Sequence, residues 1–130
     1  MKTGLVLFFS LFCFFSATSG LAADDWMQRT PLVKPSARYG HSMATIGGGK
    51  VLLFSGSTTN HSDETWLYDL LEDSWTLKSP AIRPSARQNS AIAYLGDDQV
   101  LLFGGDNSSF NDETWVYDLS DNLWTLKNPT

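Results

Sequence analysis

The chain of 130 residues contains a single cysteine, Cys13, which lies in the apolar run near the N-terminus. A disulfide within the chain needs a second cysteine, so packing alone must hold the fold together. Basic residues are also few, because nine lysines and arginines stand against 14 acidic residues, giving a net charge of −5. Without a basic stripe, nucleic acid and anionic membranes are poor partners. We therefore predict neither of them as a ligand.

Histidine is equally scarce, since His41 and His61 are the only two. A metal site in a protein needs three or four ligands, and one histidine on a strand with one on a loop does not supply them. The sequence also has no G-x-S-x-G motif and no glycine-rich phosphate loop before a helix. We predict no metal, no cofactor and no catalytic residue in this chain. Whether it is part of an enzyme is left open, and we lean against it.

The N-terminal stretch has the layout of a secretory signal peptide. A lysine follows the initial methionine, residues 4–17 are almost wholly apolar, and small residues occupy 19–23. We predict cleavage after Ala22 or Ala23, so residues 1–23 are the leader and the mature chain is secreted, periplasmic or extracellular. An uncleaved membrane anchor is the alternative, but a span needs about 20 apolar residues, more than this core offers.

The rest of the chain is an internal duplication with an offset of 49 residues. Residues 26–74 match residues 75–123 at 20 of 49 positions without a gap. The stretch from Asp63 to Trp75 returns, for example, from Asp112 to Trp124. Each copy of such a repeat is one structural unit that buries its apolar faces against its neighbours, so the repeat governs how local patterns are interpreted.

Each repeat predicts four short strands joined by turns. An apolar stretch without alternation, residues 51–54, indicates a strand buried on both faces, and residues 64–70 alternate cleanly. No apolar period of 3.6 residues occurs after the leader, so we expect no helix there. In the first repeat the expected strands are 38–46, 51–54, 64–70 and 75–80, and the strand 38–46 has its counterpart at 87–95 in the second repeat.

Four strands per unit, a period near 50 residues, a glycine pair after an apolar strand and spaced aromatic residues resemble the kelch repeat. The residues that carry the resemblance are Arg38, Gly56, Tyr68, Trp75, Arg87, Gly104, Gly105, Tyr117 and Trp124. Ser55 departs from the pattern, because the first glycine of the pair is expected there. The strict repetition of the tryptophans and tyrosines favours a role in the core over the stacking of carbohydrate.

The resemblance implies an all-β fold built from kelch-type β-propeller blades. We expect a kelch repeat region over 24–130, with one four-stranded antiparallel blade over 32–79 and a second over 80–130. Residues 26–31 would form one extra N-terminal strand, with the character of the outermost strand of another blade. In kelch proteins such a strand often completes the last blade of the ring.

Two blades are fewer than the four to eight with which propellers usually close, so two blades by themselves would not complete a ring. Two open faces would remain, and each large apolar side chain left in water forfeits about 1.5–3 kcal/mol. The blades are therefore expected to belong to a larger propeller. Either copies of the chain associate through these faces, or the chain is a fragment of a longer product. The stop at 128–130, in a connection toward another blade, favours the fragment.

The resemblance also places recognition on the loops at one face of the blades. The candidate ligand-binding residues are Arg38, Tyr39, His41, Arg87, Gln88 and Ser90, beside the loops 57–62 and 106–111. For the two arginines the alternative is structural, because they recur in step with the repeat. They would then tie neighbouring blades together by pairing with Glu64 and Glu113. Residues that differ between the repeats, such as Tyr39 and Gln88, are favoured for recognition.

We expect an exported binding module that recognises protein or carbohydrate through blade loops. The alternative is a fragment of a larger exported kelch enzyme that acts on sugars, of the oxidase or mutarotase type, with its catalytic residues in other blades. A copper oxidase of this kind uses a cysteine-linked tyrosine, and no cysteine follows the leader. A truncated product without function is a third possibility. Asn60 and Asn107 lie in glycosylation sequons of equivalent loops, and the sequence leaves their modification open.

Overall fold

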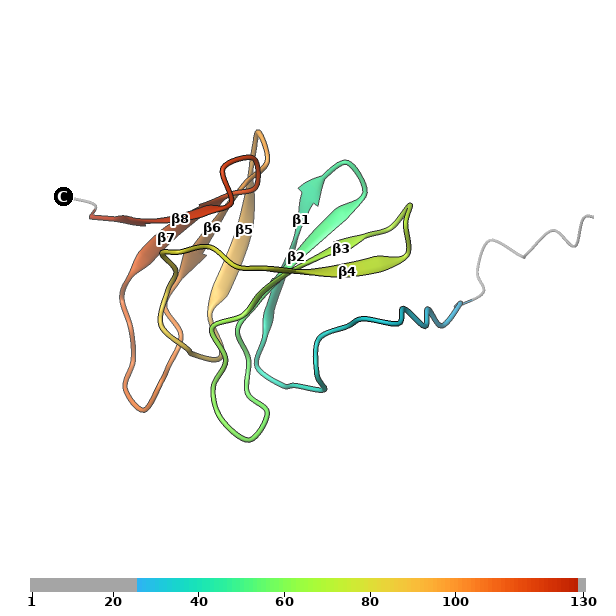
Figure 1. The fold of residues 1–130 in the computed structure, drawn as a ribbon. Helices are drawn as coiled ribbons and strands as arrows, with labels where there is room; N and C mark the ends of the chain where they lie inside the picture. The colour runs from blue at the N-terminus through green and yellow to red at the C-terminus, as the bar shows by residue number, and fades with distance from the viewer. Residues whose placement is uncertain (1–25, 129–130) are drawn as a thin grey trace, which may run out of the picture.

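The computed structural model describes residues 26–128, which form two antiparallel sheets of four strands each (Figure 1). The strands of each sheet pair in the order in which they follow one another in the chain. Blade 1 contains β1 (Ser42–Gly47), β2 (Lys50–Phe54), β3 (Thr65–Asp69) and β4 (Ser74–Lys78). Blade 2 contains β5 (Ala91–Gly96), β6 (Gln99–Phe103), β7 (Thr114–Asp118) and β8 (Leu123–Lys127). The prediction of two four-stranded antiparallel blades is confirmed, whereas the predicted leader lies outside the described residues.

Short turns make these meanders possible. Asp97 and Asp98 join β5 to β6 with φ angles of 47° and 58°, the left-handed pair that a tight hairpin needs. The turn from β7 to β8 is closed by Asp118, whose Oδ1 accepts hydrogen bonds from the backbone amides of Ser120 and Asp121 at 3.0 and 3.2 Å. Such an aspartate replaces the backbone acceptor that the turn lacks. Asp69 closes the matching turn of blade 1 in the same way.

The strand register divides the side chains of each blade between two faces. On blade 1, Val51, Tyr68 and Trp75 lie directly opposite one another across β2, β3 and β4. We call the side that carries this row the tryptophan face. Leu52 and Leu67 are paired on the other side, which Phe54 shares because it lies two residues from Leu52. We call this side the phenylalanine face.

The hydrophobic core lies between the blades, where the phenylalanine face of blade 1 packs against the tryptophan face of blade 2. Its buried members come from both sheets and are Ile46, Leu52, Phe54, Leu67, Val100, Leu102, Trp115, Tyr117 and Trp124. The rings of Phe54 and Trp124 lie 5.0 Å apart, and Trp124 Nε1 donates a hydrogen bond to Thr65 Oγ1 at 3.0 Å. Trp124 and Tyr117 of blade 2 are therefore core residues.

Two boundaries differ from the prediction. Residues 26–31 form no strand, and Trp26 is fully exposed. A strand needs a neighbour to complete its backbone ladder, and within residues 26–128 no segment pairs with 26–31. The expected strand 38–46 begins only at Ser42, because Gly40 takes a φ of 62° that interrupts the extended backbone.

Candidate functional site

One edge of the two sheets gathers the segments 38–41 and 87–90 with the loops 55–64 and 104–113. We call this edge the loop face, and it lies along the bottom of Figure 1. The segment before each first strand pairs with the loop after the second strand. Tyr39 and Ser57 exchange two backbone hydrogen bonds of 3.1 and 2.8 Å, and Gln88 and Asp106 exchange two of 3.0 and 2.9 Å. The loop face is therefore a hydrogen-bonded backbone framework rather than a set of free loops.

A glycine permits the close approach of these segments in each blade. A Cβ atom on Gly105 would lie 2.8 Å from the carbonyl oxygen of Gln88, which is too close for any side chain. Gly56 has the same role beside Tyr39. Ser55 occupies the place of the first glycine with a φ of 64°, and its buried Oγ finds no hydrogen-bond partner among residues 26–128. The departure noticed in the sequence is thus accommodated at the expense of an unsatisfied hydroxyl.

The guanidinium of Arg87 is enclosed within blade 2, and its side chain is 0% exposed. It donates to Gly104 O at 3.0 Å, to Ser85 O and Oγ at 3.0 and 2.9 Å, and to Glu113 Oε2. Glu113 also accepts from Trp115 Nε1 at 3.1 Å. The hydrogen bonds from Arg87 and Trp115 hold the pKa of the Glu113 carboxyl below its usual value.

Arg38 repeats this arrangement in blade 1, with a side chain that is 3% exposed. It donates to Ser55 O at 3.0 Å and pairs with Glu64. Burial raises the pKa of Glu64, but the hydrogen bonds from Arg38 and Trp66 outweigh it and leave the pKa lowered.

The ion pairs with Glu64 and Glu113 that the structural alternative predicted are therefore present, but each lies within one blade. The blades are joined instead by the Arg87 backbone. Its carbonyl accepts from Gly56 N at 3.0 Å, and its amide donates to Ser62 O at 3.2 Å.

The other four candidates lie beside these arginines on two adjacent segments, since Asn89 N donates to Gly40 O at 2.7 Å. Tyr39 and His41 are exposed, and Tyr39 is 63% accessible. Gln88 and Ser90 are half-buried. Gln88 donates through Nε2 to Asp106 at 3.2 Å, while its Oε1 and the Oγ of Ser90 are buried without a hydrogen-bond partner in the described part of the chain. The structure thus brings all six candidates to one edge and leaves only Tyr39 and His41 open to a partner.

A family model described as the KLHDC2/KLHL20/DRC7 Kelch-repeats domain matches residues 11–130. The chain belongs to the kelch-repeat family. Kelch-repeat domains are protein-interaction modules, so interaction with protein is the function that membership implies. No curated protein matches the chain.

Within this kelch domain the most exposed large apolar side chain on the loop face is one that the sequence did not single out. Phe110 is 96% exposed and stands between Ser109 and Asn111 in the loop from β6 to β7. It occupies the position that His61 holds in the first repeat. An aromatic residue within an otherwise polar loop was the available signal. Its backbone pairs with Asp106 in an isolated bridge, which holds the loop in place.

Two further findings concern residues 26–128 only. Their histidine and acidic side chains form no group of three or more that could hold a metal ion. No helix long and apolar enough to cross a membrane occurs in this range.

Proposed function

We propose that the chain is an exported kelch module that recognises a protein partner through the loop face, with Tyr39 and Phe110 as the contacting aromatic residues. The observation that carries the proposal is the near-complete exposure of Phe110 on a loop whose backbone is held by hydrogen bonds. Aromatic residues are enriched at protein interfaces, and a small number of them supply most of the binding energy. Because the loop is already ordered, binding costs little conformational entropy.

The charge of the chain supports a partner that is not acidic. The net charge is −5, and Asp112 on the loop face is exposed, whereas Asp63 is paired with Arg83 at 2.7 Å. Like charges slow association and weaken binding. Carbohydrate recognition stays a prediction for the same face, and the exposed ring of Tyr39 is its support. Export rests on the sequence of residues 1–23.

A selection from displayed random linear peptides tests the loop face. The full chain is expressed with its leader in a secreting host, and mass spectrometry of the exported product reports where the leader was cleaved. We expect peptides that bind the wild-type chain and lose at least tenfold affinity when Phe110→Ala or Tyr39→Ala is introduced, about 1.4 kcal/mol.

The matched control is Leu71→Ala, which truncates an exposed apolar side chain in the turn between β3 and β4, away from the loop face. Equal binding by the wild-type chain and both loop variants would contradict the proposal. Binding to a glycan array with loss in Tyr39→Ala alone would favour the carbohydrate alternative.

We also propose that the open faces of the blades, the tryptophan face of blade 1 and the phenylalanine face of blade 2, are covered by protein. The observation behind this proposal is the core between the blades, where a phenylalanine face and a tryptophan face pack against each other. On blade 2 this second surface adjoins the loop face, because Phe110 lines the hollow beside Phe103.

A further inference from the structure

The contact between the blades shows how one kelch face of this chain recognises another. The indole of Trp124 on blade 2 packs on Phe54 and donates to Thr65, both on blade 1. Alongside this pair, the backbone hydrogen bonds between Gly56 and Arg87 join the edges of the blades. The contact therefore combines an apolar surface with hydrogen bonds at fixed positions, which sets both the register and the angle between the blades.

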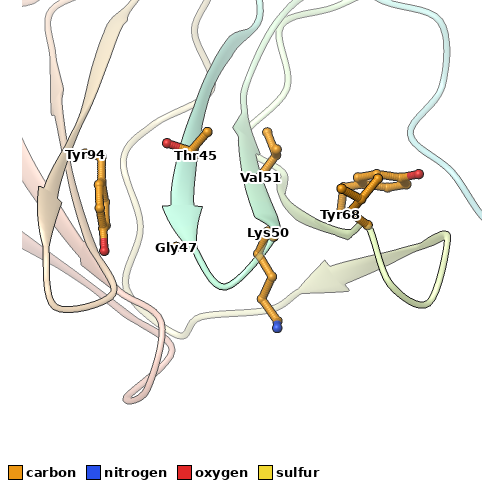
Figure 2. Close-up of a pocket in the computed structure, with 8 residues that line it drawn as sticks. Thr45, Gly47, Lys50, Val51, Tyr68 and Tyr94 are labelled. Carbon is orange, nitrogen blue, oxygen red and sulfur yellow. The ribbon is translucent and has the colours of Figure 1, made fainter. Parts of the chain in front are cut away.

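The tryptophan face of blade 1 has no blade packed against it within the described residues. A hollow of about 310 Å³ opens there, lined by Thr45, Val51 and Tyr68 together with Lys50 and Tyr94 (Figure 2). Val51 and Tyr68 are the counterparts of Val100 and Tyr117, which blade 1 covers completely.

Trp75, the counterpart of Trp124, is half-buried beside Tyr68, with ring centroids 5.1 Å apart. No hydrogen bond from its indole nitrogen forms within residues 26–128, whereas the Trp124 indole is bonded to Thr65.

The phenylalanine face of blade 2 is open as well. Phe103 is 48% exposed, although its counterpart Phe54 is wholly buried. A second hollow, of about 380 Å³, lies beside Phe103 and the glycine pair. Thr114 occupies the position of Thr65 and is half-buried.

We propose that these two open faces bind each other between copies of the chain, so that blade 2 of one copy packs head to tail on blade 1 of the next. The Trp75 indole of one copy then packs on Phe103 of its neighbour and donates to Thr114 Oγ1, as Trp124 does to Thr65 within the chain. Gly105 N donates likewise to Arg38 O. This names the partner of the open faces proposed above, and it rests on the packing of the blade faces rather than on recognition at the loop face.

A second copy is the occupant that fits, because both halves of a working interface are present on one chain. On β2 and β3 the phenylalanine face of blade 1 presents Leu52, Phe54, Thr65 and Leu67, and blade 2 carries Leu101, Phe103, Thr114 and Val116 in their places. A head-to-tail contact of this kind repeats until it closes a ring. Since propellers close with about four to eight blades and each copy supplies two, about two to four copies complete one.

Two differences make the contact between copies weaker than the contact within the chain. Ser42 Oγ donates to Ser90 O across the blades, but the residue in its place on blade 2 is Ala91, which has no hydroxyl. Thr45 replaces the larger Tyr94 at the inner end of the tryptophan face, and it lines the hollow there. Assembly therefore depends on protein concentration, whereas the pairing of blades within one chain does not.

Light scattering on a sizing column measures the mass of the exported full chain across a range of concentrations. We expect a species of about two to four copies at high concentration, dissociating to one copy on dilution. Phe103→Glu places a charge on the phenylalanine face of blade 2, and Val51→Glu places one on the tryptophan face of blade 1. Both positions are partly exposed, and each variant is expected to give single copies. Leu71→Glu, at an exposed turn off both faces, leaves the mass unchanged.

Mixing the two blocked variants decides the geometry. Each retains one intact face, so a head-to-tail contact joins one Phe103→Glu copy to one Val51→Glu copy, and the assembly stops at two copies. Circular dichroism of each variant confirms that the blades remain folded. A wild-type chain of one copy at every concentration overturns the proposal, as does an oligomer whose mass Phe103→Glu does not change. Loss of peptide binding with an intact oligomer affects only the loop face.

Discussion

Phe54 and Phe103 are the same residue at the same position of the two repeats, at the end of the same kind of strand. The first is 0% exposed and the second is 48% exposed. Trp124 and Trp75 show the reverse assignment, because the residue of blade 2 is buried and that of blade 1 is half-buried. The burial of each of these side chains therefore depends on whether a neighbouring blade packs on its face. For each covered residue, its uncovered counterpart in the other repeat serves as a control.

The largest expected effect comes from truncating the covered member of the phenylalanine pair. Phe54→Ala removes a ring from the core and lowers the free energy of unfolding by about 3–5 kcal/mol. Phe103→Ala, measured at low protein concentration, costs under about 1 kcal/mol because its ring is half in water already. Urea denaturation followed by tryptophan fluorescence measures both. Equal losses would show that the two faces are equally covered in solution.

A smaller effect is expected for the two arginines, and here the loss of stability should be the same in both blades. Arg38→Met and Arg87→Met each leave a buried carbonyl and a glutamate without their donor, and each lowers the free energy of unfolding by about 2–3 kcal/mol. The ion pairs lie within single blades, so neither variant should alter the mass of the assembly in solution. A substantial loss for Arg87→Met alone would place the role of this residue at the contact between the blades.

The smallest effect is a difference in alkaline stability between two tyrosines. Burial, with the charge of Asp118, raises the pKa of Tyr117 to about 12. The pKa of Tyr68 is also raised, chiefly by its hydrogen bond to Asp73. Above its ordinary pKa near 10, the unfolded chain releases a proton that folded Tyr117 retains, so stability falls from about pH 10 to pH 12. We expect Tyr117→Phe to flatten this fall more than Tyr68→Phe does, in denaturation curves across that range. An identical pH dependence for both variants would contradict this.

Much of the fold could be predicted from the repeat. The alternation around Trp66 and Tyr68 and the apolar run at Val51 placed strands at β3 and β2, because the period of a strand is visible in the side chains themselves. The starts of β1 and β5 were predicted too early. Gly40 and Asn89 break the strands there with φ angles of 62° and 58°, and asparagine on its own is a weak signal for that conformation.

The candidate site was predicted less completely. An arginine on a loop face can bind a ligand or form an internal ion pair. Only the position of Glu113 in the structure shows that Arg87 forms the internal ion pair. Tyr39 was predicted from its difference between the repeats and is exposed. Phe110 was missed as an individual residue because its loop lacks any period from which exposure could be inferred.

The sequence by itself determined the two-blade arrangement, since a duplication with matching strands and turns can only build the same sheet twice. Only the tertiary structure decided which faces of those sheets are covered. Phe54 and Phe103 have the same local sequence and the same strand geometry, so no local signal separates them. Burial arises from the neighbouring blade, and a neighbour is a property of the assembled structure rather than of the residues on either face.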